Sequence, residues 1–158
     1  RLVADETCDF ERACTIWDGG KVVAQAGIAR SGAHVCALDS STEFSTTLRL
    51  APGALPSGHY AHLVIDFERY EPRARSSFGA LAVLSVESQE GSKRYYEPVR
   101  MNPLPGERDG AWEHIHYEIP LPLALLPNDR VLFYIWNKEH GEFLLDDMRA
   151  QAFTVNPY

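Results

Sequence analysis

The chain has 158 residues, of which 45% are hydrophobic, and its 15 basic and 22 acidic residues give a formal net charge of −7. This length and apolar content suit one domain, residues 1–158, with a single core. The acidic residues are scattered along the chain, which argues against nucleic acid or an anionic membrane surface as the partner. No apolar run reaches the roughly 18–20 residues of a membrane-spanning helix, so we expect no membrane insertion by this segment.

The beginning of the chain gives only indirect information about its compartment. The chain starts at Arg1 without a methionine or a signal-like apolar segment, so we interpret it as a mature or excised portion of a longer polypeptide. Cys8, Cys14 and Cys36 show no CxxC spacing, which excludes a zinc ribbon. One disulfide with a leftover thiol and three buried thiols both fit this pattern, and the spacing does not decide which two cysteines would pair.

Short extended runs dominate the chain, and helical periodicity is nearly absent. Turn signals such as Asp18-Gly19-Gly20 and Gln89-Glu90-Gly91-Ser92 separate the runs, and Pro98 predicts a sheet edge. About ten short strands at this spacing predict an all-β fold, an antiparallel β-sandwich. We expect the strands at residues 8–12, 21–27, 33–38, 44–50, 59–69, 79–88, 93–100, 112–120, 130–137 and 142–153.

Two of these strands, 59–69 and 112–120, alternate between apolar and polar side chains. Leu63, Ile65 and Phe67 point to one side of the first strand and are predicted to be core. If the two strands share a sheet, their polar sides combine on one face. That face would carry His62, Asp66, Glu68, Trp112, His114, His116 and Glu118.

Strand 130–137 is apolar on both sides, with Leu132, Tyr134 and Trp136 in one row, which is typical of a central, covered strand. Aromatic rings beside carboxylates and imidazoles also suit a sugar, because a ring packs against sugar C–H groups while polar groups bind the hydroxyls. The pattern favours core and solvated faces over a glycan platform, because large aromatics contribute to any sandwich core. The candidate ligand-binding residues are Trp112, Trp136, His114, His116, Asp66 and Glu68.

The last predicted strand carries adjacent carboxylates at Asp146 and Asp147. Successive side chains of a strand point to opposite faces, so one of the two carboxylates is expected to face inward or toward a cation. Trp17, Phe10, Ile65, Phe67, Phe133 and Leu145 are the core candidates.

Fragments from the whole length of the chain occur in the order found in a known class of modules. They are Asp9-Phe10-Glu11 followed by Trp17, then Ala29-Arg30-Ser31-Gly32, then Trp112, and last Phe143-Leu144-Leu145-Asp146-Asp147. On these fragments the chain resembles the jelly-roll, galactose-binding-like carbohydrate-binding modules attached to secreted glycoside hydrolases. The residues around Cys8 and Cys14 depart from the asparagine- and glycine-rich start that is usual in these modules.

The resemblance implies that the first and last strands are neighbours. It also implies that Glu11 and Asp147 hold a structural calcium together with backbone carbonyls, with Asp146 as the alternative ligand. Calcium takes roughly 6–8 oxygen ligands, so two carboxylates and several carbonyls suit it. The competing interpretation leaves Asp146 in water and lets Asp147 cap a turn or pair with Arg149 or Arg12.

Enzyme chemistry finds little support in the sequence. His114 and His116 share a face and can chelate a transition metal, as in cupins, but Glu118 and His140 do not follow at the cupin spacing. We therefore interpret the pair as two partly exposed strand histidines. No GxSxG elbow, phosphate-binding glycine loop or HExxH helix is present.

These observations predict a non-catalytic carbohydrate-binding module with a structural calcium. Its expected partners are a glycan and the other domains of a parent protein, and its expected location is secreted, periplasmic or at the cell surface. The alternative is an accessory ectodomain of a cell-envelope protein that makes protein contacts without sugar affinity.

Overall fold

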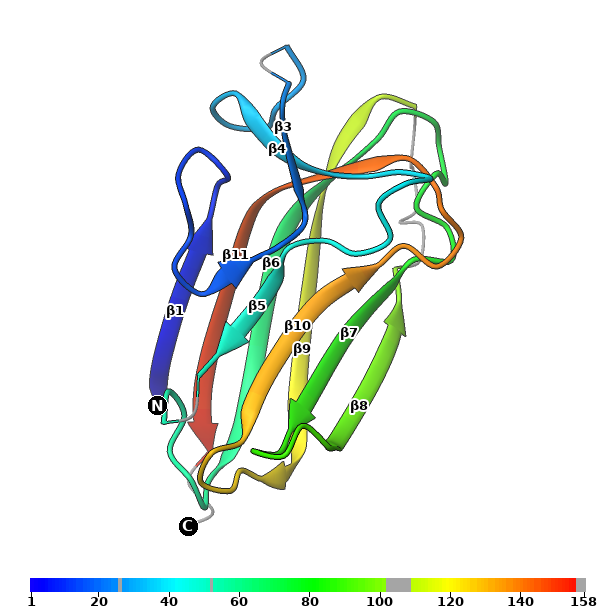
Figure 1. The fold of residues 1–158 in the computed structure, drawn as a ribbon. Coiled ribbons are helices and arrows are strands. Elements are labelled where there is room, and N and C mark those ends of the chain that lie inside the picture. The colour runs from blue at the N-terminus through cyan, green and yellow to red at the C-terminus, as the bar shows by residue number, and fades with distance from the viewer. Residues whose placement is uncertain (26, 52, 102–108, 156–158) are drawn as a thin grey trace.

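A computed structural model of the chain describes residues 1–25, 27–51, 53–101 and 109–155. The described residues form eleven strands in two antiparallel sheets that pack face to face, and none of them forms a helix that could cross a bilayer (Figure 1). The predicted all-β sandwich is confirmed. The strands are β1 (Leu2–Cys8), β2 (Trp17–Asp18), β3 (Lys21–Ala24), β4 (His34–Leu38), β5 (Thr47–Leu50), β6 (Tyr60–Glu71), β7 (Leu81–Glu87), β8 (Lys93–Arg100), β9 (Ala111–Ala124), β10 (Arg130–Trp136) and β11 (Phe143–Val155).

The six-stranded sheet is organised around the last strand. Its order is β3-β4-β11-β6-β9, and β1 pairs with β11 beyond the end of β4, so that Cys8 lies opposite Met148. The chain's first ammonium group donates to the carbonyl of Thr154 at 2.9 Å. The blue β1 and the red β11 therefore run side by side in Figure 1, and the prediction that the first and last strands are neighbours is confirmed.

The five-stranded sheet has the order β2-β5-β10-β7-β8. β10 lies in its middle, as its two apolar sides predict. The expected cover on both faces is found on the core side only, since Tyr134 and Trp136 on the outer side stay partly exposed. β8 lies at its edge, which confirms the prediction from Pro98, whose missing N–H would break a ladder inside a sheet.

Most predicted strands are found within a few residues of their expected bounds, but the first is not. The strand expected at residues 8–12 is wrong: β1 ends at Cys8, and the chain turns at Phe10, whose φ of 65° lies in the left-handed region. A disulfide between Cys8 and Cys14, with Cα atoms 5.7 Å apart, closes this turn. The short strand β2 was not predicted, and residue 26 of the strand expected at 21–27 lies outside the described residues.

The core lies between the two sheets, where the alternate side chains of both sheets meet. Ile65 and Phe67 from β6 face Phe133 and Ile135 from β10 across this space, and all four have no exposed surface. Cys36 is the free thiol of the described chain, and burial raises its pKa to about 11. The predicted core is confirmed, since all six candidates are buried: Phe10, Trp17, Ile65, Phe67, Phe133 and Leu145.

Two successive inward positions of β6 hold charges instead of apolar groups, Arg69 and Glu71. Arg69 is 1% exposed and pairs with Glu71 at 3.2 Å and Glu113 at 3.1 Å. The Glu71 carboxylate also accepts hydrogen bonds from the backbone N–H and hydroxyl of Ser77, at 2.8 and 2.9 Å. This buried network ties the loop after β6 to the sandwich.

Replacing Arg69 by methionine is expected to lower the free energy of unfolding by about 3–5 kcal/mol, because the Glu71 carboxylate would stay buried without its cation. Denaturant unfolding measures this loss. The matched control is Arg49→Met, since Arg49 pairs with Asp18 at the exposed surface and such pairs contribute about 0–1 kcal/mol. Equal losses in the two variants would contradict the account of the buried network.

Candidate functional site

The residues predicted to hold a cation converge on one segment, residues 28–34, which we term the clasp loop. The Glu11 carboxylate accepts hydrogen bonds from the backbone N–H groups of Ala33 and His34, at 2.7 and 2.6 Å, and lies 2.9 Å from His34 Nδ1. These hydrogen bonds lower the pKa of Glu11, with the contact to the imidazole of His34 as the largest cause. Gly32 is required beside them, because its φ is +60° and a Cβ there would lie 2.4 Å from the Glu11 carboxyl carbon.

Asp146 binds the same loop from the last strand. One of its oxygens accepts hydrogen bonds from the N–H groups of Arg30 and Ser31, at 3.0 and 3.1 Å, and the other accepts from Asp147 N–H at 2.8 Å. Asp146 is 0% exposed because the loop covers it, so the interpretation that left it in water is wrong. Burial raises its pKa to about 6, although the three N–H donors act in the opposite direction.

Asp147 is the extra residue of a bulge in β11. The pairing with β6 shifts register between Asp146 and Arg149, and Asp147 has a φ of +48°, which aspartate tolerates better than most residues. Its carboxylate accepts a hydrogen bond from the Ser31 hydroxyl. Asp147 does not pair with Arg149, because Arg149 forms a two-bond pair with Asp5, at 2.9 and 2.7 Å.

The raised pKa of Asp146 has a measurable consequence. A carboxyl group with a raised pKa in the folded state favours folding while it is protonated, so its contribution is present below about pH 4 and is lost as the pH rises through about 6. An NMR titration of side-chain carboxyl carbons should show a midpoint near 6 for Asp146. Asp5 is the internal control, since Arg149 lowers its pKa. A midpoint for Asp146 at or below that of Asp5 would contradict the assignment.

The outer face of the six-stranded sheet carries a cluster of histidines and carboxylates, the histidine face. β6 and β9 pair so that Asp66 lies opposite His116 and Glu68 lies opposite His114, which confirms the predicted common face. Asp66 Oδ1 lies 2.8 Å from His114 Nε2 and 2.7 Å from His116 Nδ1. On the other side of each ring, His114 Nδ1 lies 3.2 Å from Glu68 Oε1, and His116 Nε2 lies 3.3 Å from Glu118 Oε1. The two histidines are exposed as predicted, but each is held between two carboxylates.

The electrostatics of this face follow from those contacts. Burial lowers the pKa of His114, but hydrogen bonds with Asp66 and Glu68 outweigh it and raise the pKa on balance. The hydrogen bonds with Asp66 and Glu118 raise the pKa of His116. Within the described residues, the one group of three His, Cys, Asp or Glu side chains whose ligand atoms lie within 4.8 Å of one another is Asp66, His114 and His116.

Trp112 lies at the end of the histidine face but is not an open platform. Its indole N–H donates to the carbonyl of Ile28 in the clasp loop at 2.6 Å, and its ring packs against Tyr70 with centroids 5.4 Å apart. Both rings belong to a small cluster with Val35 and Leu144, which the clasp loop covers. Trp112 therefore has a structural role under the loop.

The outer face of the five-stranded sheet carries aromatic rings, which we term the aromatic row: Phe44, Tyr134, Trp136 and Tyr96. Phe44 bridges to Trp136 in an antiparallel pair, and their rings stack with centroids 6.4 Å apart. The Phe44 ring meets Tyr134 edge-on at 5.8 Å. Burial raises the pKa of Tyr134 to about 12, and the nearby Tyr96 contributes to the shift. Phe44 is 46% and Tyr96 37% exposed, so the row faces solvent.

Polar groups and hollows flank the aromatic row at both ends of β10. One hollow of about 410 Å³ is lined by Arg49, Glu87 and Arg130 among others. A second, of about 510 Å³, is lined by Arg100, Lys138 and other residues. The Lys138 ammonium lies 6.0 Å from the Trp136 ring centre, and the Trp136 indole N–H donates to Glu43 at 3.0 Å. The row thus lies between two polar hollows.

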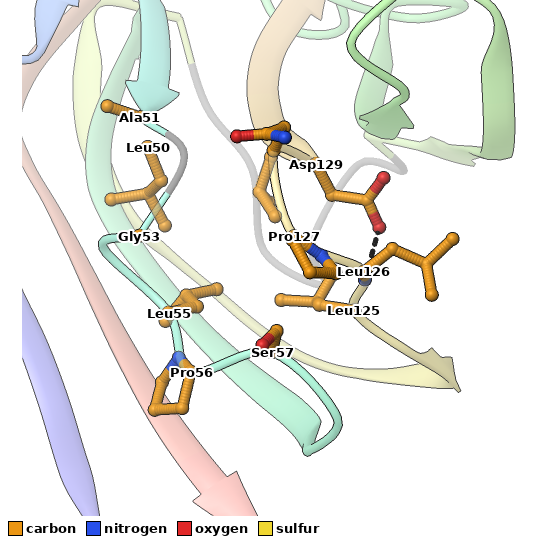
Figure 2. A pocket seen from close by; sticks show the side chains of 12 residues that line it. Leu50, Ala51, Gly53, Leu55, Pro56, Ser57, Leu125, Leu126, Pro127 and Asp129 are labelled. Atoms are coloured by element: carbon orange, nitrogen blue, oxygen red, sulfur yellow. Dashed lines mark hydrogen bonds between the residues drawn. The ribbon is translucent and has the colours of Figure 1, made fainter.

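A third hollow lies at the end of the sandwich and shares Leu50, Ala51 and Asn128 with the first hollow. Figure 2 shows this space of about 290 Å³ between the segment after β5 and the turn before β10, lined mainly by apolar side chains such as Leu55 and Leu125. Its carboxylate, Asp129, is already engaged: it accepts from Leu126 N–H at 2.8 Å and pairs with Arg94.

The structure divides the six predicted ligand-binding residues between opposite faces. Asp66, Glu68, His114, His116 and Trp112 lie on the six-stranded sheet, whereas Trp136 lies on the other sheet. They cannot form one site, because the core separates the outer faces of a sandwich. Sequence reasoning missed Phe44 as a member of the aromatic row, since it precedes β5 and no periodicity links it to β10.

Comparison with known proteins finds likeness in structure alone. No protein-family model matches the chain, and no curated protein matches it. The CBM22-1 xylan-binding domain from Paenibacillus barcinonensis has a TM-score of 0.55 at 16% identity, over 100% of this chain and 97% of that one. A xylan-binding domain of carbohydrate-binding module family 22 has a TM-score of 0.57 at 15% identity, over 94% and 93% of the two chains.

A larger protein contains a similar domain. The CBM22-1 and GH10 modules of an endo-1,4-beta-D-xylanase from Clostridium thermocellum, solved with xylohexaose, match with a TM-score of 0.60 at 14% identity. The match covers 99% of this chain and 29% of that chain. Identities this low establish the fold alone: the chain has the jelly-roll sandwich of carbohydrate-binding modules, as its sequence fragments predict.

Proposed function

We propose that this chain is a non-catalytic carbohydrate-binding module whose glycan site is the aromatic row. The observation that carries the proposal is the alternation along β10, which points Leu132, Tyr134 and Trp136 outward from the middle strand of the five-stranded sheet. Phe44 from the neighbouring segment adds a ring beside them. An exposed group of rings of this kind marks a binding surface, because leaving apolar area in water is unfavourable.

The chemistry of the row suits a sugar chain. Ring faces pack against the C–H groups of pyranoses, and planar polar groups beside them bind the hydroxyls. The guanidinium groups of Arg49, Arg130 and Arg100 and the carboxylate of Glu87 line the hollows at the two ends. β10 spans about 20 Å from Arg130 to Trp136 at roughly 3.3 Å per residue, so the face suits an oligosaccharide better than a single sugar.

Xylan is the first ligand to test, because the structural neighbours of this chain include xylan-binding domains. We further propose that the chain is exported and belongs to a larger polypeptide, as the match to part of a xylanase chain suggests. The Cys8–Cys14 disulfide supports a secreted, periplasmic or cell-surface location, because disulfides persist in oxidising compartments.

Replacing Trp136 or Tyr134 by alanine is expected to weaken binding to a retained polysaccharide about tenfold or more, since a ring contact of about 1.4 kcal/mol corresponds to that factor. Affinity gels with xylan, galactan and mixed-linkage glucan, followed by calorimetry, provide the measurement.

The matched control is Tyr60→Ala, because Tyr60 is a 45% exposed aromatic residue of the other sheet. Equal weakening by Tyr60→Ala would locate the site elsewhere. If none of the polysaccharides is retained, the glycan proposal fails, and the accessory ectodomain that makes protein contacts becomes the better account.

We also propose a structural calcium at the clasp loop, held by Glu11 and Asp147, with Asp146 as the alternative ligand. The oxygen atoms of these three carboxylates are only partly available to calcium. A carboxylate offers about four lone-pair positions, and Glu11 and Asp146 each already contact three nitrogen atoms. Asp147 accepts one hydrogen bond from a side chain and so has the most lone-pair positions left for an ion. Calcium would therefore bind Asp147 first and compete with N–H donors at the other two carboxylates.

Calcium is expected to raise the melting temperature relative to a sample in chelator, because an ion that binds only the folded state stabilises it. Magnesium at the same concentration is the control ion, since it demands a tighter octahedral geometry. The shift should disappear in Asp147→Asn. Identical melting curves with calcium and with chelator would mean that the hydrogen bonds alone hold the clasp loop.

A further inference from the structure

The geometry points to a second metal site, for a divalent transition metal such as zinc, on the histidine face. Its ligands are His114 Nε2, His116 Nδ1 and a carboxylate oxygen of Asp66. This site lies on the sheet opposite the aromatic row and is independent of the proposed glycan and calcium sites.

The three ligands already converge. The Asp66 oxygen lies 2.8 Å from the His114 nitrogen and 2.7 Å from the His116 nitrogen. In a tetrahedral zinc site with bonds of about 2.05 Å, ligand atoms are about 3.3 Å apart. The Asp66 oxygen therefore needs to move only about half an ångström away from each nitrogen. All three ligand atoms lie within 4.8 Å of one another, so small rotations of exposed side chains can complete the site.

The outer nitrogens of both rings are held in the manner of metal-binding histidines. His114 Nδ1 faces Glu68, and His116 Nε2 faces Glu118. A neutral imidazole that donates its N–H to such a carboxylate turns the lone pair of its other nitrogen toward Asp66. The lone pairs of the two ring nitrogens and the Asp66 oxygen then point at one another. These groups repel each other unless a cation lies between them.

The surrounding charges favour a cation at this point. Asp66, Glu68 and Glu118 supply three carboxylates around the two imidazoles. Two arginines lie nearby on other elements: Arg30 of the clasp loop is 3.9 Å from Glu68, and Arg149 of β11 lies opposite Asp66 but pairs with Asp5. The competing occupants are two protons, which would make both rings imidazolium.

Strand pairing fixes the backbone positions of the three ligands and explains why spacing along the chain does not reveal the third one. His114 and His116 are two residues apart on β9, and the third ligand comes from the adjacent strand β6. His116 lies directly opposite Asp66, where Cβ atoms are about 4.5–5.5 Å apart, and His114 is the diagonal neighbour at about 7–8 Å, which long side chains still bridge. Three protein ligands leave a fourth tetrahedral position open to water or to an external oxygen or nitrogen ligand.

Calorimetric titration of the full chain with zinc chloride at pH 7.5 tests the proposal. One zinc should bind per chain, and His114→Ala, His116→Ala and Asp66→Ala should each abolish this binding. Glu68→Ala and Glu118→Ala should weaken it about 10–100-fold, because outer-shell partners orient the ligands. His62→Ala is the matched control, since His62 lies on the same face of β6 and should leave the affinity unchanged.

Melting curves recorded without metal show that each variant is folded, so a loss of binding is not a loss of structure. Trp136→Ala should bind zinc like the unaltered chain, which separates this test from that of the glycan site. The proposal is overturned if zinc produces no saturable one-to-one binding. It is equally overturned if His114→Ala and His116→Ala keep the unaltered affinity, since the rings would then carry protons instead of a metal.

Discussion

The last strand, β11, pairs with β6 along one edge and with β4 and then β1 along the other. These pairings place the beginning and the end of the chain in one sheet and leave β6 and β9 on its far side. Because strands in a sheet alternate their side chains, the same pairings put Ile65 and Phe67 into the core and turn Asp66 and Glu68 outward. The position of the histidine face therefore depends on β11.

The bulge at Asp147 gives β11 a second role. An extra residue bends a strand and redirects its side chains, and here it brings two adjacent carboxylates to the clasp loop. Glu11, inside the disulfide-closed turn, binds the other end of that loop. The backbone N–H groups of the clasp loop thus bind a carboxylate near the beginning of the chain, Glu11, and one in the last strand, Asp146. The loop also covers Trp112, so it shapes one end of the histidine face.

The sequence predicts the fold well where local signals are strong. β8 begins at Lys93 and ends at Arg100 as predicted, because a glycine turn precedes it and Pro98 lies in it. Alternation predicts which side of a strand is polar but not which sheet the strand joins, so Trp112 and Trp136 could not be assigned to opposite faces. The donors to Asp146 lie 115 and 116 residues away in the chain, and no local pattern reports such contacts. The disulfide joins cysteines only six residues apart, but the spacing of three cysteines does not decide which two of them pair.

The central claim is that the aromatic row and the histidine face are separate surfaces with different ligands. The three tryptophans report on it independently, since Trp17 is in the core and Trp112 and Trp136 lie on opposite sheets. The most direct measurement is an NMR titration of their indole N–H signals with xylohexaose. The account predicts a shift of the Trp136 signal while those of Trp112 and Trp17 stay in place. A shift of Trp112 with Trp136 unchanged would contradict it.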